Sequence, residues 1–175
     1  GGNLMDFLIR EVAPMDAYEF ATVHVHSWQA AYRNIIPDEY LLRLNVEKSA
    51  ERFAKDFITY KGKTYYYAAE LKGKIIGNLA VSKCRDDDKP DAGEIIGIYL
   101  LPSYWGMGYG RKMMEFGINK LHELGYSYCC LWVLENNIRA RKFYEKYGFI
   151  FDGTKKEINL GRPLVEIRYM LSLSK

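Results

Sequence analysis

The chain has few cysteines, and their arrangement is not that of a disulfide framework. Cys84, Cys129 and Cys130 are odd in number and two are adjacent, which fits reduced thiols. Neighbouring residues on a strand point to opposite faces, so Cys129 and Cys130 are poor joint ligands for one metal. His24 and His26 have the same problem on a helix, where two residues turn about 200°. We expect all five to be packing or surface residues, with no metal bound.

Long apolar runs and basic blocks are also missing. No apolar stretch is long enough to cross a bilayer. The acidic run Asp86–Asp88 and the lack of a basic stripe argue against nucleic acid as a partner. Residues 1–7 lack the pattern of a secretory signal, and Gly1–Leu4, ahead of Met5, look like an expression remnant. We therefore expect a cytoplasmic protein that binds neither membrane nor nucleic acid.

The length and composition are those of one soluble domain. A chain of 175 residues fits one compact unit with a sizeable core better than two. Hydrophobic residues make up 49% and charged residues 27%, an ordinary globular composition. The formal charge of +3 is mild and suits an anionic ligand. We expect residues 6–173 to form a single domain.

The order of local signals predicts a mixed α/β sheet with helices on its faces. Expected strands are apolar or β-rich runs bounded by turns, at about 7–12, 63–71, 74–82, 94–101, 127–134, 149–156 and 165–173. Expected helices begin near proline, glycine or asparagine, and two of them stop at a glycine. They cover about 14–33, 37–60, 109–124 and 137–147.

A glycine-rich segment follows the strand at 94–101. Gly106, Gly108 and Gly110 have no side chains, so the backbone can take positive φ angles and approach a ligand closely. They precede a helix, whose first N–H groups and dipole favour an anion, and Arg111 adds positive charge. The segment predicts a pyrophosphate site, and the alternative is a tight turn that binds nothing. Its spacing matches neither a P-loop nor a dinucleotide-binding fold.

Two blocks of the chain resemble the GNAT superfamily of N-acetyltransferases. The family signature, Gln/Arg-x-x-Gly-x-Gly/Ala after a strand, corresponds to Trp105–Gly110. A second family block, Asn-x-x-Ala-x-x-x-Tyr-x-x-x-Gly-Phe, corresponds to Asn137–Phe149. The order of elements fits the family from about residue 6 to 173. Trp105 is the one departure, because the family usually has Gln or Arg there.

This resemblance implies an acetyl-CoA-dependent acyltransferase whose central sheet has about seven mostly antiparallel strands. It also implies that the backbone of Ile98–Leu100 pairs with the pantetheine arm. The residues it implies for cofactor binding are Ile98, Tyr99, Leu100, Gly106, Met107, Gly108, Tyr109, Gly110, Arg111 and Asn137. For Asn137 a plain helix N-cap is the alternative. Trp105 should leave the backbone loop intact but puts a side-chain contact to phosphate in question.

The resemblance also implies catalytic roles for two residues. Tyr144 would be the general acid near the sulfur of coenzyme A, with core packing as the alternative. A free tyrosine has a pKa of about 10 and a thiol about 8.5, so a hydrogen bond to the developing thiolate is easier than full proton transfer. Glu94 would be the base, in register with Ile96 and Ile98, where burial raises a carboxyl pKa. The alternative is an acid at a wet strand end.

Substrate selection is expected in the first helices. Trp28 and Tyr32 are four residues apart on one face and would wall the acceptor site, with helix packing as the alternative. The amine would attack the thioester directly in a ternary complex, without a metal. The acceptor would be a polyamine, an amino sugar, a small metabolite or a protein N-terminus. A non-catalytic coenzyme A-binding regulatory module is the other class, and a homodimer is one expected assembly because family members often dimerise.

Overall fold

The structure is a computed structural model that describes residues 6–173, and the expected expression remnant lies outside them. The strands are β1 Phe7–Glu11, β2 Thr64–Leu71, β3 Lys74–Lys83, β4 Ala92–Leu100, β5 Tyr128–Leu134, β6 Ile150–Asn159 and β7 Pro163–Ser172. The helices are α1 Ala17–Ala31, α2 Asp38–Leu42, α3 Val46–Thr59, α4 Tyr109–Glu123 and α5 Ile138–Glu145, with short 3-10 turns at Pro14–Asp16 and Pro102–Tyr104. Among the described residues no helix is both long and apolar enough to cross a membrane.

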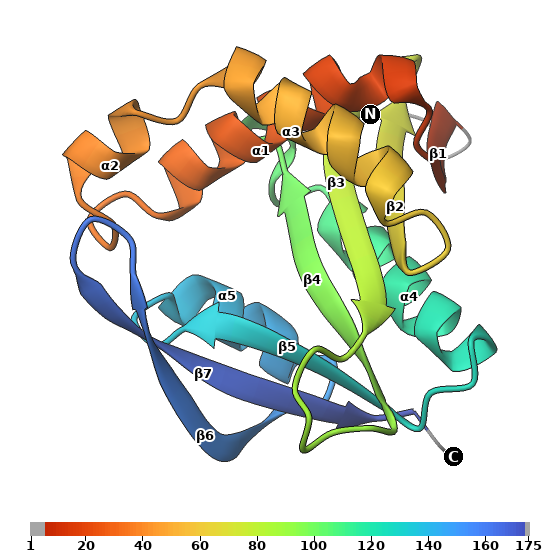
Figure 1. Ribbon diagram of the computed structural model, residues 1–175, viewed down its shortest axis with the longest axis vertical. Coiled ribbons are helices and arrows are strands. Elements are labelled where there is room, and N and C mark those ends of the chain that lie inside the picture. Colours follow the sequence, from red (N-terminus) through yellow and green to blue (C-terminus); the bar gives the residue numbers. More distant parts are fainter. Residues whose placement is uncertain (1–5, 174–175) are drawn as a thin grey trace.

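All seven strands belong to one sheet with the order β1-β2-β3-β4-β5-β7-β6 (Figure 1). Each neighbouring pair is antiparallel except β4 and β5, which are parallel. Parallel neighbours need a crossover connection, and α4 supplies it. The predicted mixed, mostly antiparallel sheet with flanking helices is confirmed.

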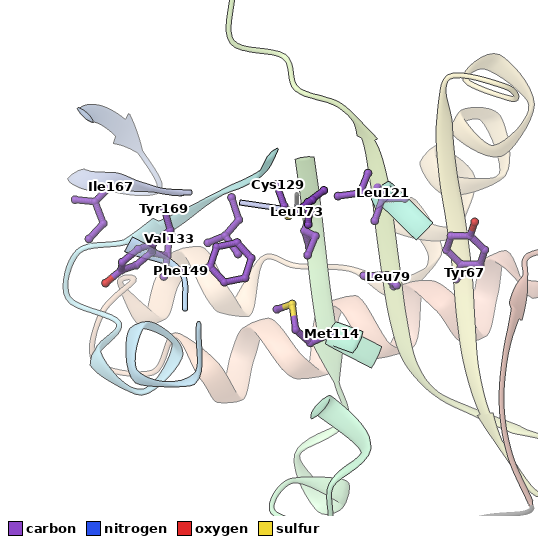
Figure 2. Packing of buried hydrophobic residues seen from close by; sticks show 13 residues of the cluster. Tyr67, Leu79, Met114, Leu121, Cys129, Val133, Phe149, Ile167, Tyr169 and Leu173 are labelled. Carbon is purple, nitrogen blue, oxygen red and sulfur yellow. The ribbon is translucent and has the colours of Figure 1, made fainter. Parts of the chain in front are cut away.

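Helices cover both faces of the sheet and bury a core on each. On one face, Phe20 of α1 packs edge-on against Phe53 and Phe57 of α3, with ring centroids 4.8 and 5.2 Å apart. On the other face, Met114 and Leu121 of α4 lie among apolar side chains of five strands and of the segment around Phe149 (Figure 2). α5 packs beside α4 on this second face through its own apolar stripe.

The helix expected over 37–60 is interrupted, which corrects the prediction. Residues 43–45 separate α2 from α3, because Asn45 has an extended backbone with φ −127° and ψ 124°. Its side chain accepts a hydrogen bond from the Lys48 backbone N–H at 2.9 Å and so starts a new helix. Asn45 was not predicted to be a helix cap.

Gly93, at the start of β4, provides a test of this packing. A Cβ at Gly93 would lie 2.6 Å from a methyl carbon of Leu121 and 2.8 Å from the Tyr126 ring. Leu121 is fully buried and has little room to move. We expect Gly93→Ala to lower the free energy of unfolding by about 1–3 kcal/mol, as overpacked cores do.

Denaturant unfolding measures this loss, and Gly117→Ala is the matched control. A Cβ at Gly117, in α4 and against the same core, would be 3.5 Å from its nearest neighbour, an ordinary contact. Alanine also favours a helix by about 0.5–1 kcal/mol over glycine. We expect this variant to be as stable as the parent or more so. Equal unfolding midpoints for the Gly93→Ala variant and the parent would contradict the packing described.

Candidate functional site

β4 and β5 pair over a short stretch and then separate. Ala92–Glu94 pair with Tyr128–Cys130, although both strands continue beyond these residues. Figure 1 shows β4 and β5 diverging from their paired ends. The edge of Ile98–Leu100 that does not pair with β3 therefore has no neighbouring strand. Its backbone groups are available to a ligand, except the Leu100 carbonyl, which accepts a hydrogen bond from the Trp105 indole N–H.

A bulge in β4 lies just beyond the paired stretch. The pairing with β3 shifts by one residue between Ile95 and Gly97, so Ile96 is the extra residue. As a result Ile95 and Ile98 both pack in the core under α4. Regular alternation would put residues three apart on opposite faces. Glu94 therefore faces away from α4 while Ile98 faces toward it, and the expected register of Glu94 with Ile98 is wrong.

The glycine loop connects the end of β4 to α4. Gly106 and Gly108 have φ angles of +77° and +90°, a region that other residues rarely adopt. A Cβ built on either would meet no atom within 4 Å, so the loop backbone is open on that side. Gly108 is the N-cap of α4, and the N–H groups of the first helical turn have no partner within the helix. The loop has the geometry of an anion site.

α5 forms the opposite wall of a cleft of about 870 Å³. Asn137 is the N-cap of α5, since its Oδ1 accepts a hydrogen bond from the Ala140 backbone N–H at 3.3 Å. The cleft is bordered by the end of β4, the glycine loop, α1 and α5. Its lining includes four cationic side chains, Arg111, Arg139, Lys142 and Lys146. An extended anionic ligand fits this combination of open strand edge, glycine loop and positive charge.

A sequence model of the acetyltransferase (GNAT) family matches residues 25–149, which include the glycine loop and α5. The chain belongs to this family. It is an acetyl-CoA-dependent N-acetyltransferase, as the resemblance predicted. The cleft fits coenzyme A, because the loop suits a pyrophosphate and the free edge of β4 suits the amide groups of pantetheine.

Known relatives cover most of the chain. The uncharacterized N-acetyltransferase YuaI of Bacillus subtilis is 30% identical over 164 residues, which are 89% of this chain and 92% of YuaI. A probable spermine N(1)-acetyltransferase of Bacillus subtilis subsp. natto is 33% identical over 104 residues, 57% of this chain and 66% of that protein. The crystal structure of PaiA N-acetyltransferase from Thermoplasma acidophilum in complex with coenzyme A has a TM-score of 0.76 at 20% identity, over 95% of this chain and 98% of that one. This last likeness concerns the fold.

Most residues predicted to bind the cofactor line the cleft, namely Ile98, Tyr99, Leu100, Gly106, Gly108, Gly110, Arg111 and Asn137. Two do not. Met107 is exposed, and Tyr109 is buried with its ring 4.9 Å from that of Phe7. Of the other predicted site residues, Tyr144 and Tyr32 line the cleft. A role of any of them in binding remains a prediction.

Three half-buried tyrosines, Tyr32, Tyr99 and Tyr144, line the cleft. The hydroxyl oxygens of Tyr32 and Tyr99 are 3.3 Å apart. Burial raises the pKa of Tyr32, of Tyr99 and of Tyr144, so all three stay protonated at neutral pH. Trp28 packs against Tyr32 with ring centroids 4.9 Å apart. Tyr32 lines the cleft and Trp28 does not, and a role of either in acceptor binding stays a prediction.

Glu94 is buried and paired with Arg85. Its side chain is 1% exposed and does not belong to the cleft lining, so the alternative of a wet strand end is wrong. The Arg85 guanidinium donates to both carboxylate oxygens, at 3.2 Å from Nε and 2.6 Å from Nη2. The Arg85 backbone N–H adds a third hydrogen bond at 3.1 Å. The base role of Glu94 stays a prediction.

The thiols of Cys84 and Cys130 lie beside Glu94. Their sulfurs are 3.0 Å apart, and the three potential ligand atoms lie within 4.8 Å of one another. Arg85 already occupies the carboxylate, and burial raises the pKa of both thiols, which disfavours the thiolate needed for a metal. Cys129 points to the opposite face, into the core under α4. All three cysteines are buried and none forms a disulfide, and the expectation that they bind no metal stays a prediction.

Glu166 of β7 is a carboxylate that the sequence analysis missed. It is opposite Leu134, which is four residues beyond Cys130 on β5. Cys130 is in turn opposite Glu94, so Glu94 and Glu166 project from the same face of the sheet. The one sequence signal was a pair of charged residues, Glu166 and Arg168, within the otherwise apolar run Leu164–Met170.

The Glu166 carboxylate is largely free of partners. Its nearest cation is the Lys156 ammonium at 3.9 Å, and it accepts no hydrogen bond from any described residue. Burial raises its pKa, an effect that Lys156 and Arg85 reduce and that Glu94 increases. Its charge in turn helps to raise the pKa of Tyr32, which lines the cleft. Glu166 therefore lies within electrostatic reach of the site.

Gly108→Glu tests the glycine loop as a cofactor site. The substitution puts bulk and negative charge where a pyrophosphate would bind. We expect affinity for coenzyme A, measured by calorimetry, to fall at least about tenfold, which corresponds to about 1.4 kcal/mol.

Gly125→Glu is the matched control, because Gly125 has a φ of +93° and equally open surroundings at the other end of α4. The two variants carry the same strain and charge, so only the first should lose affinity. Unchanged affinity in a folded Gly108→Glu variant would mean that the anion site lies elsewhere.

Proposed function

We propose that the protein transfers the acetyl group of acetyl-CoA to a primary amine, which attacks the thioester directly in a ternary complex. The observation that carries this proposal is the cleft in which the free edge of β4, the glycine loop and Tyr144 meet. The loop Gly106–Arg111 would hold the pyrophosphate, and Ile98–Leu100 would pair with the pantetheine arm as an added strand does. The side-chain amide of Asn137 would donate to the same arm.

Tyr144 would stabilise the thiolate that leaves when the acetyl group is transferred. Burial is the main cause that raises the pKa of Tyr144, and the nearby Tyr99 raises it further. The hydroxyl is therefore a neutral donor at working pH. Full proton transfer to a thiolate is then more unfavourable than for a free tyrosine. A hydrogen bond aimed at the developing negative charge needs no such transfer and is strong in a poorly solvated site. We therefore assign Tyr144 the donor role.

The amine must also lose a proton. A lysine-like ammonium with a pKa of about 10.4 is neutral in only about one molecule in 2,500 at pH 7, so a base speeds the reaction. Glu94 is the base predicted from the sequence, and its burial behind Arg85 means that a water would have to relay the proton. Glu166 is the second candidate, and its raised pKa and unoccupied carboxylate favour it.

The acceptor class is tested directly with a panel of amines. Polyamines come first in this panel, because one relative is described as a probable spermine N(1)-acetyltransferase. Amino sugars and peptides with free N-termini follow. Release of the coenzyme A thiol reports turnover with each. A protein that binds coenzyme A tightly but turns over none of these amines would instead be a regulatory coenzyme A-binding module.

Tyr144→Phe tests the donor role, because it removes only the hydroxyl. We expect the turnover rate to fall about 10- to 1,000-fold with little change in coenzyme A affinity. Steady-state kinetics and calorimetry on the same preparation separate the two effects. Tyr147→Phe is the matched control, since Tyr147 packs on Phe143 at 5.3 Å and is not part of the cleft lining. Equal turnover in the Tyr144→Phe variant and the parent would assign Tyr144 to packing alone.

Glu166→Gln and Glu94→Gln, measured in parallel over pH, identify the base. A base works only when deprotonated, so kcat/KM should fall as pH drops through its pKa, and burial moves that limb of the profile to higher pH for Glu166. We expect Glu166→Gln to be slow at neutral pH and to recover as pH approaches the pKa of the amine.

Glu94→Gln should instead leave the shape of the profile unchanged and lower the thermal midpoint, because Arg85 loses a buried partner. The opposite pair of profiles would assign the base role to Glu94.

A further inference from the structure

Trp105 and Arg139 meet across the mouth of the cleft. The central carbon of the Arg139 guanidinium lies 3.7 Å from the centre of the Trp105 ring, a close cation–π contact. Trp105 precedes the glycine loop on the β4 side, whereas Arg139 belongs to the first turn of α5 on the opposite side. Both side chains line the cleft. The contact thus joins its two walls beside Gly106.

A hydrogen bond to the end of β4 holds the Trp105 side chain in place. Its indole N–H donates a hydrogen bond to the Leu100 carbonyl at 2.8 Å, at the end of the free edge of β4. An arginine stacked on an aromatic face keeps its N–H groups in the guanidinium plane, where they can still bind a phosphate. Trp105 therefore orients Arg139 without using the donors of its guanidinium.

The charge of Arg139 is not compensated within the described part of the chain. No carboxylate lies within ion-pair distance, and partial burial lowers its pKa. Arg10, Arg85 and Arg168, by contrast, are each paired with acids. Arg139 is also the second residue of α5, where a positive charge opposes the helix dipole. A bound anion would remove both unfavourable contributions.

Assuming the function proposed above, we propose that Arg139 binds the pyrophosphate of coenzyme A and that Trp105 is its positioning residue. The family usually has Gln or Arg at the position before the glycine loop. In this chain two residues would share the role of that side chain. Tryptophan supplies the platform, and an arginine from α5 supplies the charge. The same guanidinium chemistry could also recognise the 3′-phosphate, so the test must separate the two phosphates.

The test measures the affinities of CoA, 3′-dephospho-CoA and pantetheine for the parent and for Arg139→Met by calorimetry. Methionine keeps an apolar stem on the Trp105 ring and removes the charge. We expect affinity for CoA and for 3′-dephospho-CoA to fall equally, by about 10- to 100-fold, as for a lost charged hydrogen bond. Affinity for pantetheine, which has no phosphate, should not change. Arg139→Lys should fall between the parent and Arg139→Met, because it keeps the charge but loses the planar fork.

Trp105→Leu tests the positioning role. It should weaken CoA binding in the parent but not in the Arg139→Met background, because the platform has no guanidinium left to orient. Arg52→Met is the control, since Arg52 is also a stacked arginine, 4.8 Å from the Phe53 ring, and is not part of the cleft lining. It should leave all three affinities unchanged.

The outcomes distinguish this inference from the proposed function. A parent protein that binds no CoA would refute the proposed function. A parent that binds CoA, with equal affinity in a folded Arg139→Met variant, would refute only the role of Arg139. Loss of affinity for CoA but not for 3′-dephospho-CoA would overturn the pyrophosphate assignment in favour of the 3′-phosphate. Additive losses in the Trp105→Leu, Arg139→Met double variant would overturn the positioning role.

Discussion

The short parallel pairing between β4 and β5 is the constraint on which the site depends. The two strands share backbone pairing only at Ala92–Glu94 and Tyr128–Cys130, and the bulge at Ile96 then bends β4 away. A fully paired β4 would leave no free strand edge and no space between the glycine loop and α5. Parallel pairing also requires a crossover, and the helix that provides it, α4, begins at the cleft. One irregularity in the sheet therefore creates both the opening and the anion site beside it.

Charge is distributed in a way that the net value does not reveal. Cations line the cleft, while two acids, Glu94 and Glu166, project from the face of the sheet away from α4. The acidic run in the loop after β3 has another purpose, because Asp86 and Asp88 pair with Arg168, whose side chain is 3% exposed. That pairing ties the loop carrying Arg85 to β7. The feature read from the sequence as evidence against nucleic acid is a structural anchor.

The sequence predicted features that depend on local chemistry and missed those that depend on pairing. The glycine loop and the Asn137 cap follow from the conformational needs of single residues, and the structure has both. The bulge at Ile96 could not be predicted, because the run Glu94–Ile98 is almost uniformly apolar and any register buries it equally well. For that reason the prediction that Glu94 and Ile98 share one face of the sheet was wrong. Glu166 and Arg139 were missed because their environment comes from strands and helices distant in sequence.

The proposed reaction involves two charges, the proton lost by the amine and the negative charge that develops on sulfur. The bulge also separates the groups that would interact with each. Without it, alternation would place Glu94 on the same face as Ile98, facing α4. With it, Glu94 and Glu166 face away from α4, while the cations of the cleft come from the glycine loop, α4 and α5. A proton released by an amine would thus move toward acids on one side, and negative charge on sulfur would develop near donors on the other. Tyr32, Tyr99 and Tyr144 line the cleft as neutral hydroxyls, because burial raises the pKa of each. Neutral hydroxyls can stabilise either charge by hydrogen bonding without adding a charge of their own. A permanent charge among them would favour either deprotonation of the amine or departure of the thiolate at the expense of the other step.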